Sequence, residues 1–121
     1  MGLFGNAHTV DAASAQQEYG RLLGQGEQVY AAYVLIRDTL LFTDTRLILI
    51  DKQGLTGKKT EYHSVPYRSI THFSVETAGT FDLDAELKLW ISSNPTPLQK
   101  TFTKGVDIYE VQAILARFVA R

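Results

Sequence analysis

Strict alternation of apolar and polar residues marks residues 82–92 as the clearest strand in the chain. Side chains of a strand point alternately to its two faces, so this pattern predicts one buried face and one solvated face. Trp90 is the exception, because this large aromatic residue falls on the polar face with Asp82, Asp84, Glu86 and Lys88. The apolar face comprises Leu83, Ala85, Leu87, Leu89 and Ile91.

Residues 29–36 show a different pattern, because they are apolar on both faces. Such a strand is either central in its sheet or covered on its second side by a partner. Five further runs of apolar and β-branched residues predict strands at 39–43, 47–50, 61–67, 70–76 and 98–103. The strand region therefore spans residues 28–104 and holds seven strands.

Helical spacing occurs only before and after this region. Residues 10–23 predict a short helix with Thr9 or Asp11 as its N-cap and Gly24 at its exit, although Gly20 inside it disfavours helix. Residues 107–120 predict a second helix, with Asp107 as N-cap and Glu110 in the capping-box position. Its apolar stripe consists of Ile108, Val111, Leu115 and Phe118.

Consecutive short strands joined by short turns indicate an antiparallel meander, a small barrel or an orthogonal sandwich. The closing helix must bury its stripe, and the open end of a bent sheet is the natural place for it. We expect Leu83, Leu87 and Leu89 to face Val111, Leu115 and Phe118. The length of 121 residues favours a single domain over residues 1–121, with an N-terminal extension and helix at 1–24.

The composition argues against several classes of function but does not identify one. The net charge is −1, from 12 Lys and Arg against 13 Asp and Glu, which argues against nucleic acid as a partner. The absence of cysteine excludes disulfides, thiolate nucleophiles and Cys-ligated metals. The longest apolar run, residues 29–36, is too short to span a membrane, and the first residues do not resemble a signal peptide. We therefore expect a cytoplasmic protein for which a membrane partner is disfavoured.

The sequence resembles the bacterial PH-domain family of pleckstrin-homology-like proteins. The matching stretches are residues 26–27, 37–38, 42–48, 51–59, 66–67, 73–79, 81–87 and 104–109. This resemblance implies a mainly β, seven-stranded, bent antiparallel barrel with a C-terminal capping helix. It also implies a closed cyclic homo-oligomer, a pentamer for a member without an added helical hairpin, that binds an unidentified protein partner. It does not imply an enzyme.

No motif predicts a catalytic, cofactor-binding or metal-binding residue. The loop at residues 54–60 has two residues between its glycines and a strand after it, whereas a phosphate-binding loop needs four residues and a helix. His8, His63 and His72 are isolated along the sequence, and the carboxylates of Asp82, Asp84 and Glu86 favour a solvated or intersubunit face. An enzymatic function is a third alternative, because a pocket can assemble between subunits.

A charged cluster at one set of strand ends is the candidate surface for a protein partner. Its members are Arg37, Asp38, Thr43, Asp44 and Arg46. The structural alternatives are an Asx-turn at Asp44 and an intramolecular ion pair at Arg46.

Trp90, with Val29 and Val34, is the candidate oligomer interface, because tryptophan is enriched at interface centres. The alternative for Trp90 is packing within its own chain through strand twist. Lys58 and Lys59 are the candidates for a second function, binding to an anionic lipid surface, although two lysines supply only about 1 kcal/mol each.

Overall fold

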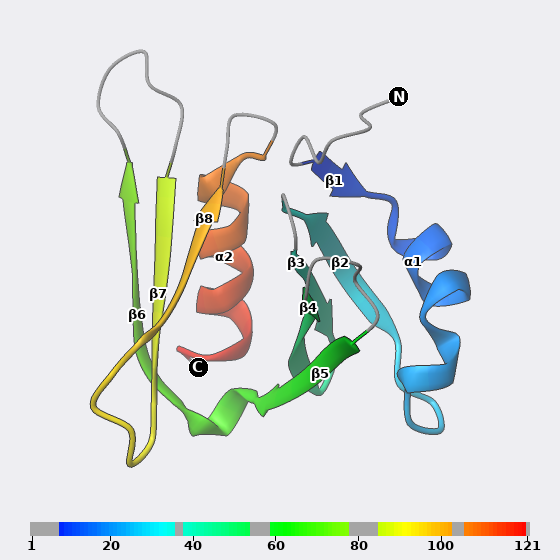
Figure 1. The fold of residues 1–121 in the computed structure, drawn as a ribbon, viewed down its shortest axis with the longest axis horizontal. Helices are drawn as coiled ribbons and strands as arrows, with labels where there is room; N and C mark the ends of the chain where they lie inside the picture. Colours follow the sequence, from blue (N-terminus) through cyan, green and yellow to red (C-terminus); the bar gives the residue numbers. More distant parts are fainter. Residues whose placement is uncertain (1–7, 36–37, 54–58, 78–84, 103–105, 121) are drawn as a thin grey trace. The chain divides into compact units, whose positions relative to one another are not determined.

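The computed structural model describes residues 8–35, 38–53, 59–77, 85–102 and 106–120, and contacts divide the chain into two compact units, Met1–Val65 and Pro66–Arg121 (Figure 1). The first unit contains a five-stranded sheet with the order β1-β2-β3-β4-β5. Its strands are β1 (His8–Val10), β2 (Val29–Val34), β3 (Asp38–Thr43), β4 (Arg46–Gln53) and β5 (Lys59–Pro66). The expectation of one domain over the whole chain stays a prediction.

The N-terminal helix is shorter than expected. Val10 belongs to strand β1, which pairs with β2 and was not predicted. Helix α1 (Ala12–Glu18) has Asp11 as its N-cap, whose carboxylate accepts hydrogen bonds from the backbone N and hydroxyl of Ser14, at 3.1 and 3.2 Å. It ends before Gly20, the residue with the greatest entropic cost in a helix, and the chain continues as the 3₁₀ turn η1 (Gly20–Leu22).

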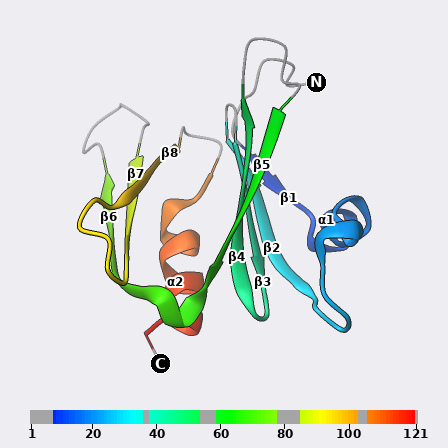
Figure 2. The ribbon, with the colours of Figure 1, turned by 60° about the horizontal axis from the view of Figure 1, so that its bottom comes forward.

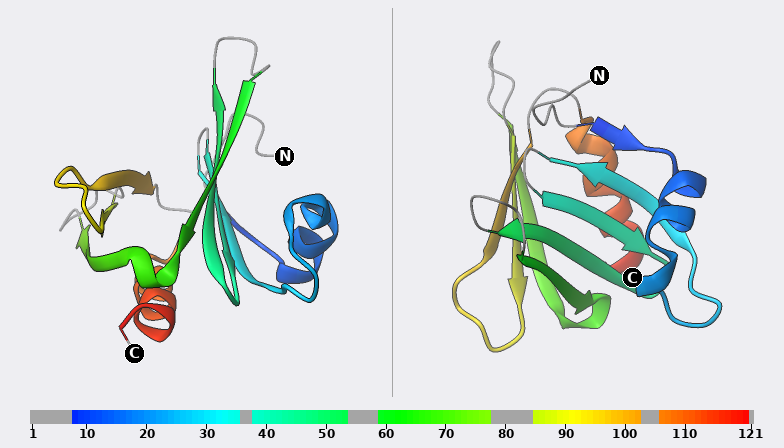
Figure 3. Two further views of the ribbon diagram at one scale, coloured as in Figure 1. Left: turned by 90° about the horizontal axis from the view of Figure 1, so that it is seen from below. Right: turned by 45° about the vertical axis from the view of Figure 1, so that its right-hand side comes forward.

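Helix α1 covers one face of the five-stranded sheet (Figures 2 and 3). Ala15 of α1 is fully buried in a core formed with Val29, Ala32, Leu41, Ile48 and Ile50, against which Val10, Ala12, Tyr19, Leu22 and Leu23 pack. Tyr33 and Phe42 are also fully buried and meet edge to face, with ring centroids 6.0 Å apart. Strand β2 is therefore apolar because it is central in its sheet and carries α1 on one side.

The second unit contains a three-stranded antiparallel sheet with the order β6-β7-β8. The 3₁₀ turn η2 (Tyr67–Ser69) leads into β6 (Ile70–Thr77), which is followed by β7 (Ala85–Ile91) and β8 (Leu98–Phe102). Leu87 and Leu89 are buried, as the alternating pattern predicts, whereas Leu83 lies outside the described residues.

Helix α2 (Ile108–Phe118) lies beside this sheet and contacts β6. Asp107 is its N-cap, and its carboxylate accepts a hydrogen bond from the backbone N of Tyr109, at 3.0 Å. The buried stripe is Ile108, Val111, Ile114 and Leu115. Phe118 is half-buried and stacks on Tyr67, with centroids 4.7 Å apart.

The prediction of a mainly β fold with a C-terminal helix is confirmed, but the count and closure of the strands differ. The described residues form eight strands, one more than expected, because β1 lies in the N-terminal segment, residues 1–24, where only a helix was predicted. Their hydrogen bonds join them in two separate sheets rather than a closed barrel.

Candidate functional site

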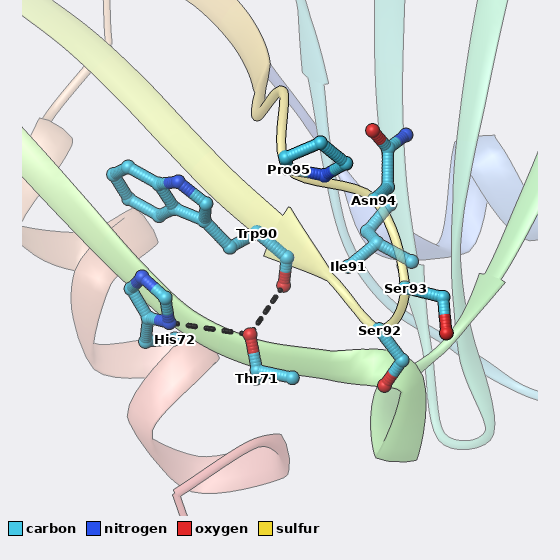
Figure 4. A pocket seen from close by; sticks show the side chains of 8 residues that line it. All are labelled: Thr71, His72, Trp90, Ile91, Ser92, Ser93, Asn94 and Pro95. Carbon is cyan, nitrogen blue, oxygen red and sulfur yellow. Dashed lines mark hydrogen bonds between the residues drawn. The ribbon is translucent and has the colours of Figure 1, made fainter.

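A hollow of about 400 Å³ opens on the second unit, where β7 turns toward β8 (Figure 4). Thr71 and His72 of β6, Trp90 of β7 and residues 91–95 line it. The lining combines an aromatic wall with hydroxyl, amide and imidazole groups. This mixture suits a ligand group that has an apolar body and a polar tip.

The aromatic wall is formed by a cross-strand pair. His72 lies directly opposite Trp90 in the β6–β7 ladder, and the two rings are stacked with centroids 4.4 Å apart and planes 15° apart. The ladder is irregular between Ile70 and His72, which leaves Thr71 as an extra residue. Because of this bulge, the adjacent residues Thr71 and His72 both line the hollow.

Thr71 determines which nitrogen of His72 carries a proton. Its hydroxyl donates to the carbonyl oxygen of Trp90, at 3.1 Å, and also lies 3.2 Å from Nδ1 of His72. A hydroxyl has one proton, so the contact with Nδ1 must be one in which Thr71 accepts. Nδ1 of His72 therefore bears hydrogen, and Nε2 of the neutral ring is a hydrogen-bond acceptor.

The turn after β7 is tightly organised. Asn94 donates its backbone N–H to Ile91, at 3.0 Å, and its side-chain oxygen accepts from the backbone N of Thr96, at 3.1 Å. Ser93 has φ 68°, a left-handed conformation that non-glycine residues rarely adopt. The hydrogen bonds of Asn94 hold this strained turn, and it is residues of this turn that complete the hollow.

Two members of the predicted charged cluster, Thr43 and Arg46, belong to an internal hydrogen-bond network in the first unit. Arg46 makes a salt bridge to Glu27, with Nη2 2.9 Å from Oε1, and its Nε donates to Oε2, also at 2.9 Å. The guanidinium further donates to the carbonyl of Leu22 and the hydroxyl of Ser64, both at 2.7 Å. The structural alternative for Arg46, an ion pair within the chain, is what the structure contains.

Glu27 is the buried centre of this network, since only 7% of the residue is exposed. Hydrogen bonds from Arg46 lower the pKa of Glu27 to about 2, against the opposing effect of burial, and the hydroxyls of Thr43 and Thr45 and the backbone N of Gly24 contribute. The same contact raises the pKa of Arg46. Glu27 was missed among the candidate residues, because no local pattern distinguishes it from a solvated glutamate.

The structure separates the members of the charged cluster. Thr43 is fully buried, and Arg46 is paired with Glu27. Asp44 is exposed, and its side chain accepts a hydrogen bond from the backbone N of Gln28, at 3.2 Å, instead of forming an Asx-turn. Asp38 is half-buried at the start of β3. Arg37 lies outside the described residues.

The candidate interface and lipid residues also differ in exposure. Val29 belongs to the core under α1, Val34 is half-buried, and Trp90 is half-buried beside His72. The core position of Val29 removes the need for a partner over that face of β2. Lys59 is exposed on β5, and Lys58 lies outside the described residues.

The described part of the chain contains no group of three side chains able to hold a metal ion. Within the same residues, no helix has the length and apolar character needed to cross a membrane.

Comparison with known proteins gives consistent matches over nearly the full length. The model of the bacterial PH domain matches residues 1–119. The uncharacterised protein YjqA of Bacillus subtilis strain 168 is 57% identical over 116 residues, which are 95% of this chain and 93% of YjqA.

Two crystal structures show the same fold. A protein with a pleckstrin-homology domain from Shewanella loihica PV-4 is 57% identical, with a TM-score of 0.85 over 95% of this chain and 98% of that chain. A pleckstrin homology domain from Shewanella amazonensis SB2B is 53% identical, with a TM-score of 0.81 over 97% of this chain and 94% of that chain.

Proposed function

Because the chain belongs to the bacterial PH-domain family, we propose that it is a cytoplasmic, non-catalytic interaction module that works as a homo-oligomer. The observation that carries this proposal is the Trp90–His72 pair in its hollow, on the outer face of a strand that is otherwise polar there. An aromatic side chain held open beside hydrogen-bonding groups is typical of a contact centre in a protein interface. The proposal agrees with a family that is generally non-catalytic.

The expected assembly is a closed ring, five-membered by the family resemblance. A ring repeats every surface once per subunit, so a weak site for a protein partner gains strength through avidity. Asp44 is the best candidate for that repeated surface, because it is exposed at the β3–β4 turn. Thr43 and Arg46 act there as the support that holds the turn, since their polar groups bind Glu27.

Size exclusion with light scattering tests the oligomer first. We expect one species near five subunits at micromolar concentration, and a monomer mass would overturn the module as proposed.

Affinity capture from the native cytoplasm then tests the partner surface. We expect Asp44→Arg to lose proteins that the wild type captures while it keeps the oligomer mass. Glu61→Arg is the matched control, because Glu61 is an exposed acidic residue on β5, and it should capture as the wild type does. Equal capture by Asp44→Arg and wild type would exclude the β3–β4 turn as the partner surface.

A further inference from the structure

Two features of the second unit complement each other chemically. One is the hollow, with the aromatic face of Trp90 and the acceptor Nε2 of His72. The other is Tyr109, which is 68% exposed, more than Tyr30 at 45% or Tyr62 at 53%, the other exposed large hydrophobic residues of the described chain. A tyrosine has an aromatic body for the wall and a hydroxyl donor for the imidazole.

Tyr109 cannot reach the hollow of its own chain. Strand β8 runs away from the hollow, and its last residue, Phe102, pairs with Ala85 at the far end of β7. Helix α2 begins at that far end (Figure 1), whereas Trp90 lies five residues further along β7, or roughly 16 Å at the rise of a strand. The tyrosine and the hollow therefore lie at opposite ends of the three-stranded sheet.

We propose that Tyr109 of one copy enters the Trp90 hollow of the next copy and that its hydroxyl donates to Nε2 of His72. This inference rests on the proposed homo-oligomer and names its contact. The tyrosine ring packs beside Trp90 and Pro95, and the hollow of about 400 Å³ has room for one such side chain. The fixed proton on Nδ1 prepares His72 as the acceptor before the partner arrives.

This contact is head-to-tail, because each subunit contributes a tyrosine at one end and a hollow at the other. Contacts of this kind close into a ring when the rotation per subunit allows it, and otherwise extend into a filament. In a closed ring every hollow is filled by a neighbour, so a protein partner must bind elsewhere.

Two single variants separate the halves of the contact. Tyr109→Ala removes the inserted side chain, and Ser92→Arg fills the hollow from an exposed position of its lining. We expect each variant alone to be a folded monomer in light scattering, with circular dichroism and melting temperature close to wild type. Tyr62→Ala, which removes an exposed tyrosine of β5, is the control and should assemble as wild type.

Mixing the two variants gives the decisive measurement. A mixed pair retains one intact contact, between Tyr109 of the Ser92→Arg copy and the open hollow of the Tyr109→Ala copy. We therefore expect a species of two subunits in a one-to-one ratio and no larger one. Tyr109→Phe, which lacks only the hydroxyl, should weaken assembly roughly 3- to 10-fold, the effect of one hydrogen bond.

The measurements distinguish a failure of the proposed oligomer from a failure of the Tyr109 contact. A monomeric wild type would overturn both the proposed oligomer and this contact. If the wild type is an oligomer and the Tyr109→Ala variant, measured by itself, has the same oligomer mass, this contact alone is overturned. Two monomeric variants that form no mixed pair would also overturn it. Emission from Trp90, the sole tryptophan of the chain, gives an independent readout, because it should shift with assembly in wild type and not in Tyr109→Ala.

Discussion

The guanidinium of Arg46 and the carboxylate of Glu27 face each other in a two-pronged contact, with both hydrogen bonds 2.9 Å long. Because Arg46 also binds the carbonyl of Leu22, this pair ties the segment before β2 to the β3–β4 turn. Charge-assisted pairs of this geometry are strong, and breaking one leaves a charge without its partner. The pair is therefore central to the stability of the first unit.

Replacing Glu27 by Gln should lower the free energy of unfolding by about 2–3 kcal/mol. The expected loss is below that of a fully buried pair, because the Arg46 side chain is 25% exposed and regains some hydration. Urea denaturation measures the change. Glu61→Gln is the control, since Glu61 is exposed, and an equal loss in both variants would contradict a special role for Glu27.

Acid should destabilise the protein through the same residue. Its folded pKa, about 2, lies below the ordinary value of 4.5, so the unfolded chain binds a proton more readily. The stabilisation from Glu27 is thus complete above pH 4.5 and is lost as the pH falls toward 2. Urea denaturation at a series of pH values should show this loss of stability in wild type and not in Glu27→Gln. If the free energy of unfolding depends on pH in the same way in both proteins, Glu27 is not the cause of the acid destabilisation.

Gln16 of α1 should contribute to stability through its side-chain amide. Its oxygen accepts from the backbone N of Val29, at 2.6 Å, and its nitrogen donates to the carbonyl of Glu27, at 3.1 Å. Gln16→Ala should cost about 1–3 kcal/mol, because two backbone groups lose their partner. The adjacent exposed residue provides the control, since Gln17→Ala should change stability by less than about 0.5 kcal/mol. Similar losses in the two variants would refute this role.

Leu115 should be essential to the packing of α2, because its side chain is fully buried. Leu115→Ala should destabilise the protein by about 2–5 kcal/mol, the usual cost of such a truncation. Thermal melting against Gln112→Ala, an exposed position of the same helix, measures the difference. An unchanged melting temperature in Leu115→Ala would mean that α2 is not part of the core.

Anionic vesicles should not bind the protein in a salt-sensitive manner. Lys59 is exposed but lies two residues from the exposed carboxylate of Glu61 on β5, which offsets its charge. Vesicle sedimentation at low and high salt tests this expectation with wild type and with Lys58→Ala combined with Lys59→Ala. Binding that salt and the double variant both abolish would instead support the lipid alternative.

Local features of the chain were predictable from the sequence because they depend on neighbouring residues. The alternation predicts the burial of Ala85, Leu87 and Leu89, since a strand turns successive residues to opposite faces, whereas Ile91, expected on the same face, is only half-buried. Asp107 was predicted as a helix N-cap, and Asp11 was one of two candidates with Thr9, because a short polar side chain can accept from the free backbone N–H groups of the first turn. The family resemblance added the overall fold.

Contacts between distant residues were decided only by the tertiary structure. Glu27 and Arg46 are 19 residues apart, and their pairing depends on how the segment before β2 returns to the β3–β4 turn. His72 looked isolated along the sequence, and only the β6–β7 register, with its extra residue at Thr71, puts it on Trp90. The sequence identifies polar and aromatic residues by type. The return of the chain before β2 decides that Glu27 meets Arg46, and the bulged β6–β7 register decides that His72 and Trp90 line one hollow.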